Sequence, residues 1–228
     1  MKKEIKKIVG DTKKLTCEVL KDKKSIIIAS TLFGLFVVLV ALVIFGATMN
    51  IDTAVFDFLI SLKSKFLTGF MYFFTELGST KLVILLVLIG LVISYFLKKL
   101  DWFKYAFLNV ASCAVMMKVI KSIVRRPRPE WRWIPEDGFS FPSGHTICAV
   151  ALYGCLILFV SKSNLKCKKL IIALLGFIGA IIGISRIYFG VHYLTDVLGS
   201  LLLASGLLVL TNSFMNVEFK KNAKNKNK

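Results

Sequence analysis

Long apolar runs separated by short polar segments dominate the chain. The first run, residues 25–47, contains no charged side chain. It is long enough to cross the ~30 Å hydrocarbon core of a bilayer at ~1.5 Å per helical residue. Further candidate spans are residues 82–97, 105–124, 144–160, 170–184 and 193–210. The pattern therefore predicts an all-α, polytopic membrane bundle with six transmembrane helices.

Residues 50–80 lie between the first two predicted spans and have a different pattern. This segment is apolar but is interrupted by charged side chains, among them Asp57, Lys63, Lys65 and Glu76. Such a mixture is typical of amphipathic helices that lie at the membrane interface. The alternative is that this segment forms a seventh span.

The charge distribution favours six spans. The chain is 56% hydrophobic and carries a formal net charge of +18, and lysines outnumber acidic residues in four segments, 1–24, 98–104, 161–169 and 216–228. Six spans place all four segments on one side of the membrane, whereas seven would separate them. Because positive flanking segments remain cytoplasmic, both termini are predicted to be cytoplasmic and the protein to reside in the cell membrane. The basic charge then requires no nucleic-acid partner.

The expected organisation is a cytoplasmic basic N-terminus over residues 1–24, one membrane domain over 25–213 and a disordered basic tail over 214–228. A mean hydropathy of +0.73 excludes a water-soluble domain.

All five arginines and both histidines lie between residues 125 and 192. The first motif in this region is Lys121-x6-Arg128-Pro129, which begins in the third predicted span and leaves the membrane. A guanidinium can bind two phosphate oxygens with its planar fork, whereas a lysine acts as a point charge. Prolines on both sides of Arg128 would end the helix and fix the direction of its side chain.

The second motif, Pro142-Ser143-Gly144-His145, directly precedes the fourth predicted span. Proline and serine suit the start of a helix, where unpaired backbone N–H groups and a partial positive charge attract anions. Gly144 would let the backbone approach a phosphate closely. An ordinary helix start with an interfacial histidine would have the same sequence.

The third motif, Ser185-Arg186-x5-His192-x3-Asp196, joins the fifth and sixth predicted spans. The i, i+4 spacing lets the Asp196 carboxylate accept a hydrogen bond from one imidazole nitrogen of His192 and leaves the other free to attack. A purely structural histidine and aspartate pair is the alternative. In the six-span topology all three motifs reach the same, extracytoplasmic face, and this favours a site for phosphoryl transfer.

Together the three motifs resemble the type 2 phosphatidic acid phosphatase superfamily, and the six-span layout resembles its bacterial membrane lipid phosphatase branch. The resemblance covers residues 121–196. It implies a hydrolase in which His192 is the nucleophile, Asp196 orients it and His145 protonates the leaving oxygen. It also implies that the phosphoryl group is held, without a metal or cofactor, by Lys121, Arg128, Ser143, Gly144 and Arg186.

A site at the membrane surface suits a lipid phosphate or diphosphate. Phosphatidylglycerophosphate and phosphatidate qualify, and undecaprenyl diphosphate is favoured because Arg125, Arg126 and Arg132 could bind a second phosphate. Binding of these arginines to anionic headgroups is the alternative. A phosphotransferase using the same phosphohistidine, or a transporter or lipid-binding protein with intramembrane charges, also remains open. The oligomeric state is not encoded in these patterns.

Overall fold

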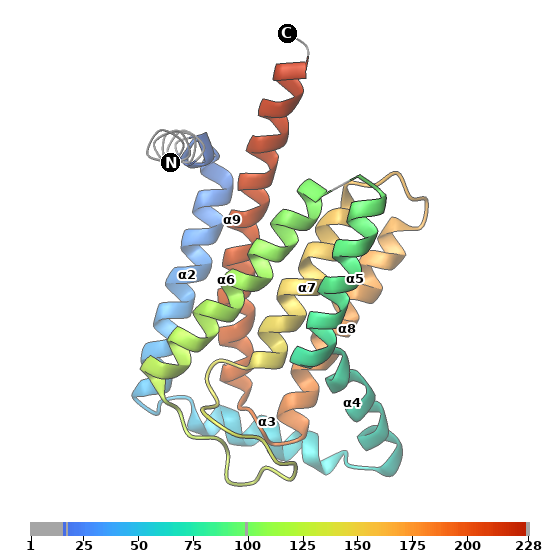
Figure 1. The fold of residues 1–228 in the computed structure, drawn as a ribbon. Helices are drawn as coiled ribbons and strands as arrows, with labels where there is room; N and C mark the ends of the chain where they lie inside the picture. The colour runs from blue at the N-terminus through green and yellow to red at the C-terminus, as the bar shows by residue number, and fades with distance from the viewer. Residues whose placement is uncertain (1–15, 17, 99, 227–228) are drawn as a thin grey trace.

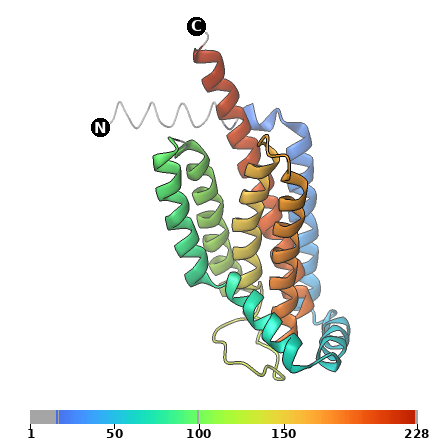
Figure 2. The same cartoon turned by 90° about the vertical axis from the view of Figure 1, so that its right-hand side faces the viewer.

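The computed structural model describes residues 16, 18–98 and 100–226, which form helices joined by short connections and one long loop (Figures 1 and 2). Serine side chains begin several of these helices; Ser79 and Ser143, for example, accept hydrogen bonds from the backbone N–H groups of Leu82 and Thr146. The helices are α2 (Lys23–Ile44), α3 (Met49–Ser61), α4 (Lys65–Leu77), α5 (Thr80–Phe96), α6 (Leu100–Val124), α7 (Gly144–Ser161), α8 (Lys168–Tyr188) and α9 (Leu194–Lys226).

The bundle is organised around α9, which packs against α2, α6 and α7 (Figure 1). Its largest apolar cluster joins these four helices, while α5 lies at the edge of the bundle with many apolar side chains exposed, as expected of a helix in lipid. The buried members of the cluster include Phe36, Cys113, Ile147, Leu203 and Ala204.

The number of spans agrees with the expectation from the sequence. Among the described residues, five helices are long and apolar enough to cross a membrane, and a sixth is counted if α4 and α5, which meet at a bend of 48°, form one span. The helices of the 50–80 segment, α3 and α4, have 13 residues each. At ~1.5 Å per residue each is shorter than the ~30 Å core, so the segment adds no independent seventh span.

The end of the bundle opposite the C-terminus is closed by α3, which lies across it, and by the loop of residues 125–143 (Figure 1). Phe141 anchors this loop. Its ring is fully buried, lies 5.9 Å from the ring of Phe36 and packs on Gly199 of α9, where a Cβ atom would come within 2.6 Å of the ring. Glycine at position 199 therefore allows the loop to approach α9 closely.

The C-terminal segment differs from the expectation. Residues 214–226 continue α9 as a helix, whereas the sequence predicted a disordered tail from residue 214. The cause is packing against α6: Phe219 lies 5.3 Å from the ring of Trp102, and Glu218 forms an ion pair with Lys104 at 3.3 Å. Most of the predicted N-terminal segment, residues 1–15 and 17, and residues 227–228 lie outside the described residues.

Replacing Phe141 by alanine tests the anchoring of the loop. We expect Phe141→Ala to lower the free energy of unfolding by about 3–5 kcal/mol, because it leaves a cavity between the loop and the helices that surround the ring. The measurement is thermal unfolding of the detergent-solubilised protein. Phe139→Ala, in the same loop but with its side chain 39% exposed, is the matched control. Equal destabilisation by the two substitutions would contradict the anchoring role.

Candidate active site

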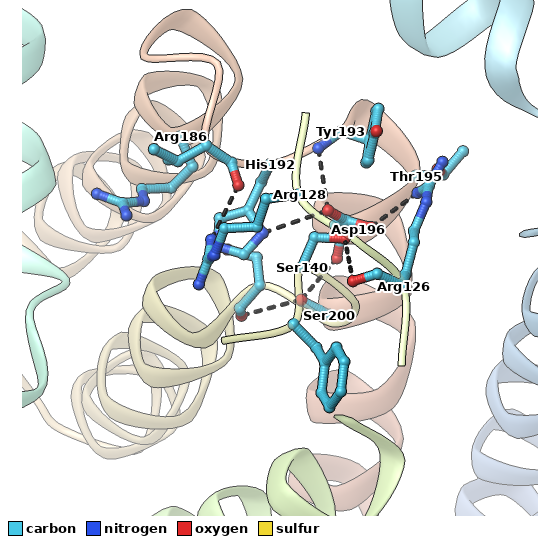
Figure 3. A network of polar contacts seen from close by, with 12 residues as sticks. Arg126, Arg128, Ser140, Arg186, His192, Tyr193, Thr195, Asp196 and Ser200 are labelled. Atoms are coloured by element: carbon cyan, nitrogen blue, oxygen red, sulfur yellow. Dashed lines mark hydrogen bonds and ion pairs between the residues drawn. The ribbon is translucent and has the colours of Figure 1, made fainter. Parts of the chain in front are cut away.

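The three motifs meet at the end of the bundle that α3 and the 125–143 loop close. Lys121 lies in the last turn of α6, Ser143 and His145 begin α7, Arg186 lies in the last turn of α8 and Asp196 lies in the first turn of α9. The loop brings Arg128 against His192, as Figure 3 shows. The segments that the sequence singled out therefore form one cluster.

The turn after α8 determines where His192 lies. Gly190 adopts a positive φ of +67°, its N–H donates to the carbonyl of Ile187, and the N–H of Val191 donates to the carbonyl of Arg186. This is the Schellman pattern that ends helices, and it favours glycine at this position. The N–H of His192 also donates to the Arg186 carbonyl, at 3.3 Å. The helix end thus fixes the nucleophile candidate beside the arginine of the same motif.

The hydrogen bond expected between His192 and Asp196 is present. His192 Nδ1 lies 3.2 Å from Asp196 Oδ2, and both side chains are buried. Because a carboxylate only accepts, Nδ1 carries the proton and Nε2 presents its lone pair. Nε2 faces the guanidinium of Arg128, 3.2 Å away. The imidazole is therefore oriented by an acid on one side and faces a cation on the other.

Burial and positive charge keep His192 neutral. Desolvation lowers the pKa of His192 well below its ordinary value of 6.5, and the charges of Arg128, Arg186 and Lys121 lower it further. Both causes disfavour the imidazolium form. A neutral imidazole is the form that can attack phosphorus.

Arg128 is held by the backbone of its own loop. Its Nη2 donates to the Asp137 carbonyl at 2.8 Å, its Nε to the Gly138 carbonyl at 3.0 Å and its Nη1 to the Val191 carbonyl at 2.9 Å. Lys121 likewise donates to a loop carbonyl, that of Phe139. Carbonyl oxygens, which carry no net charge, therefore supply the hydrogen bonds that orient both cations.

Arg186 is almost fully buried and has two side-chain partners. Nη1 donates to Thr75 Oγ1 of α4 at 2.9 Å, and Nη2 pairs with the carboxylate of Glu136, which also lies 3.7 Å from Arg128 Nη2. Nε of Arg186 is buried and without a hydrogen-bond partner among the described residues. A buried donor of this kind can bind an oxygen of an anion. Thr75 and Glu136 lie outside the three motifs, and no signal in the sequence marked them.

The start of α7 is joined to the start of α9. Ser143 caps α7 and its N–H donates to the Asp196 carbonyl at 3.3 Å, while Ser200 Oγ donates to both the Ser143 and the Asp196 carbonyls, at 3.1 and 2.7 Å. His145 follows in the first turn of α7 and interacts electrostatically with the ring of His192. Both imidazoles are therefore on the same side of the bundle.

Arg126 departs from the expectation that it is an additional phosphate ligand. Its side chain is only 8% exposed, and it forms ion pairs with Asp196 at 2.8 Å and with Asp52 of α3 at 2.7 Å. Figure 3 shows Arg126 on the side of Asp196 that faces away from His192. The sequence could not indicate this arrangement, because Asp52 lies in a distant segment and only the tertiary fold brings it to Arg126.

Comparisons with known proteins identify the family of this chain. The model of the PAP2 superfamily matches residues 102–220. Phosphatidylglycerophosphatase B of Bacillus subtilis is 32% identical over 189 residues, which cover 81% of this chain and 93% of that protein. Lipid phosphate phosphatase delta of Arabidopsis thaliana is 31% identical over 119 residues, but these cover only 45% of this chain and 28% of that protein.

Two solved structures are similar as well. The crystal structure of a transmembrane PAP2 type phosphatidylglycerolphosphate phosphatase from Bacillus subtilis has a TM-score of 0.72 and 30% identity, covering 86% of this chain and 96% of that chain. The crystal structure of Aquifex aeolicus LpxE has a TM-score of 0.56 and 27% identity, and the match covers 72% of this chain and 94% of that chain. By its sequence, its helices and its motifs, the chain belongs to the PAP2 superfamily and is a multi-span membrane phosphatase that acts on lipid phosphates.

Proposed function

We propose that this enzyme hydrolyses phosphatidylglycerophosphate at the extracytoplasmic membrane surface through a phosphohistidine on His192. The observation that carries the proposal is the orientation of His192: its Nδ1 is hydrogen-bonded to Asp196, and its Nε2 points at Arg128 in a cluster of cations. An attacking group with an orienting acid and an anion-binding cluster is what covalent phosphoryl transfer requires.

In the first step, His192 Nε2 attacks phosphorus and forms the P–N bond while the bond between phosphorus and the lipid oxygen breaks. His145 donates a proton to the leaving oxygen, so that the lipid departs as an alcohol. In the second step, water attacks phosphorus, His145 accepts its proton and the P–N bond breaks. Inorganic phosphate is released and both histidines return to their initial states.

The cations stabilise the charge that develops on the phosphoryl oxygens. Arg128 and Arg186 would bind them with guanidinium donors, including the unpaired Nε of Arg186. Lys121 adds a point charge, and the α7 start at Ser143 and Gly144 adds backbone N–H groups and a partial positive charge. Donors that are fixed before the reaction stabilise the transition state without reorganisation.

The proposed orientation rests on charge. Among the described residues of the lysine-rich segments, 98, 100–104 and 161–169 lie at the end of the bundle towards which the C-terminal part of α9 runs, and the site lies at the opposite end (Figure 1). Because positive flanking segments remain cytoplasmic, the termini would be cytoplasmic and the site extracytoplasmic. The proposed domain is residues 25–213, with α3 at the membrane surface beside the site.

The choice of substrate combines the relatives and the site. The sequence favoured undecaprenyl diphosphate because three additional arginines could bind a second phosphate, but Arg126 is buried between Asp52 and Asp196. The similar Bacillus subtilis proteins are named for phosphatidylglycerophosphate. The proposal therefore places phosphatidylglycerophosphate first and undecaprenyl diphosphate second.

Replacing each histidine by alanine tests their roles. We expect His192→Ala to abolish inorganic phosphate release and ³²P labelling of the protein, because no nucleophile remains. His145→Ala should lower kcat by about 10²-fold to 10⁴-fold, the usual contribution of a general acid, with a small change in KM. Near-normal hydrolysis by His192→Ala would contradict the mechanism. Transfer of ³²P to a second alcohol without phosphate release would indicate a phosphotransferase.

The protonation of His192 gives a second test. Because burial and the neighbouring cations depress its pKa, the neutral nucleophile should persist as the pH falls through 6.5, the ordinary value. The chain has only two histidines, so the NMR spectrum of histidine-labelled protein in detergent micelles is simple, and His145→Ala assigns it. Protonation of His192 at or above pH 6.5 in the substrate-free enzyme would contradict the depressed pKa.

A panel of three lipids tests the substrate. At equal mole fractions in the same detergent micelles, we expect kcat/KM to be higher for phosphatidylglycerophosphate than for undecaprenyl diphosphate or phosphatidate. The measurement is release of inorganic phosphate at initial rates, with His192→Ala as the background. A higher kcat/KM for undecaprenyl diphosphate would reverse the proposed order.

A further inference from the structure

A buried chain of charged side chains runs from α3 to the candidate nucleophile. It begins at Asp52, passes through Arg126 and Asp196 and ends at His192, with distances of 2.7, 2.8 and 3.2 Å between successive members. The exposed fractions are 0% for Asp52 and Asp196, 8% for Arg126 and 2% for His192. Only the last two members, Asp196 and His192, belong to the family motifs.

Arg126 divides its guanidinium between the two acids. Nη1 donates to Asp196 Oδ1 and Nη2 to Asp52 Oδ2, so the planar fork sets the separation of the carboxylates. The ring of Tyr193 lies under the guanidinium, with Arg126 Cζ 3.8 Å from the ring centroid. Asp196 Oδ2 is left for His192 Nδ1 and for the N–H of Tyr193, at 3.2 and 3.0 Å.

Asp52 is held as firmly as Asp196. Thr195 donates to it from both its backbone N–H, at 2.9 Å, and its hydroxyl, at 2.8 Å, and Thr48, the residue before α3, donates at 3.0 Å. The Thr195 hydroxyl also accepts from Arg126 Nη1 at 2.8 Å. These bonds satisfy a buried carboxylate that would otherwise be costly.

Asp52 sets the net charge of the group that it forms with Arg126 and Asp196. A single arginine beside Asp196 would form a neutral pair with it and weaken the pull of the carboxylate on His192. With Asp52 present, two carboxylates share one guanidinium, and the group retains one negative charge next to the imidazole. That charge favours a proton on Nδ1 and stabilises positive charge on the ring as phosphorus bonds to Nε2.

We propose that Asp52 and Arg126 are positioning residues that act through Asp196: Arg126 fixes its carboxylate, and Asp52 balances Arg126 so that Asp196 keeps its negative charge towards His192. This inference rests on the proposed function, because it assigns the two residues to the phosphohistidine reaction. It also ties the surface helix α3 to the nucleophile, because Asp52 is supplied by α3.

The first test replaces Asp52 by asparagine, which keeps the shape and removes the charge. We expect Asp52→Asn to lower kcat for phosphatidylglycerophosphate in detergent micelles by about 10-fold to 100-fold, the range known for the outer partners of metal-binding histidines, with KM nearly unchanged. A contribution to folding alone would reduce the fraction of active protein, which burst-phase ³²P labelling counts separately. Asp57→Asn, an exposed acid on the same helix, is the matched control and should match the wild type.

A second pair of variants tests the proposal if Asp52→Asn alone does not fold. Arg126→Gln leaves two unbalanced carboxylates, whereas Arg126→Gln combined with Asp52→Asn restores the single negative charge of the group. The double variant should therefore have a higher kcat than Arg126→Gln. A double variant no faster than Arg126→Gln, or a folded Asp52→Asn with wild-type kcat, would overturn the inference. Activity of His192→Ala would instead overturn the proposed function, so the two failures are distinguishable.

Discussion

The buried carboxylate of Asp196 is the constraint on which the site depends. A buried carboxylate is costly unless it is paired with a cation and hydrogen-bonded. Asp196 receives donors from Arg126, His192 and the backbone of Tyr193. Satisfying this one group brings together the loop after α6, the turn after α8 and the first turn of α9.

The cations of the site are oriented in different ways, and one carboxylate, that of Glu136, lies between Arg128 and Arg186. Arg128 and Lys121 are oriented mainly by carbonyl oxygens of the 125–143 loop, which carry no net charge. Arg126, in contrast, is neutralised by two acids. Arginines two positions apart in the sequence thus have different partners: Arg128 faces the imidazole of His192, and Arg126 pairs with Asp196, the acid beside that imidazole.

The membrane explains why this arrangement lies at one end of the bundle. The long helices expose many apolar side chains, and buried polar groups gather at one end of the bundle. There α3 and the 125–143 loop cover the helix ends (Figures 1 and 2). A lipid phosphate lies at the level of the headgroups, so a site at a helix end can bind the phosphate while the acyl chains remain in the bilayer. The fold therefore suits a substrate that never has to leave the membrane.

The sequence by itself determined the helical membrane class, the approximate spans and the residues of the three motifs, because hydrophobic length, charge bias and the spacing of His192 and Asp196 are local properties. It also indicated that the motifs would share one end of the bundle, since each adjoins a span. The tertiary structure decided the partners: Asp52 for Arg126, and Thr75 and Glu136 for Arg186. These contacts join segments far apart in the chain, and the packing of α9 against α6 reaches Phe219, within the segment that the sequence predicted to be disordered. Local sequence patterns do not encode these side-chain partners or the packing of α9 on α6, because both depend on how distant helices pack.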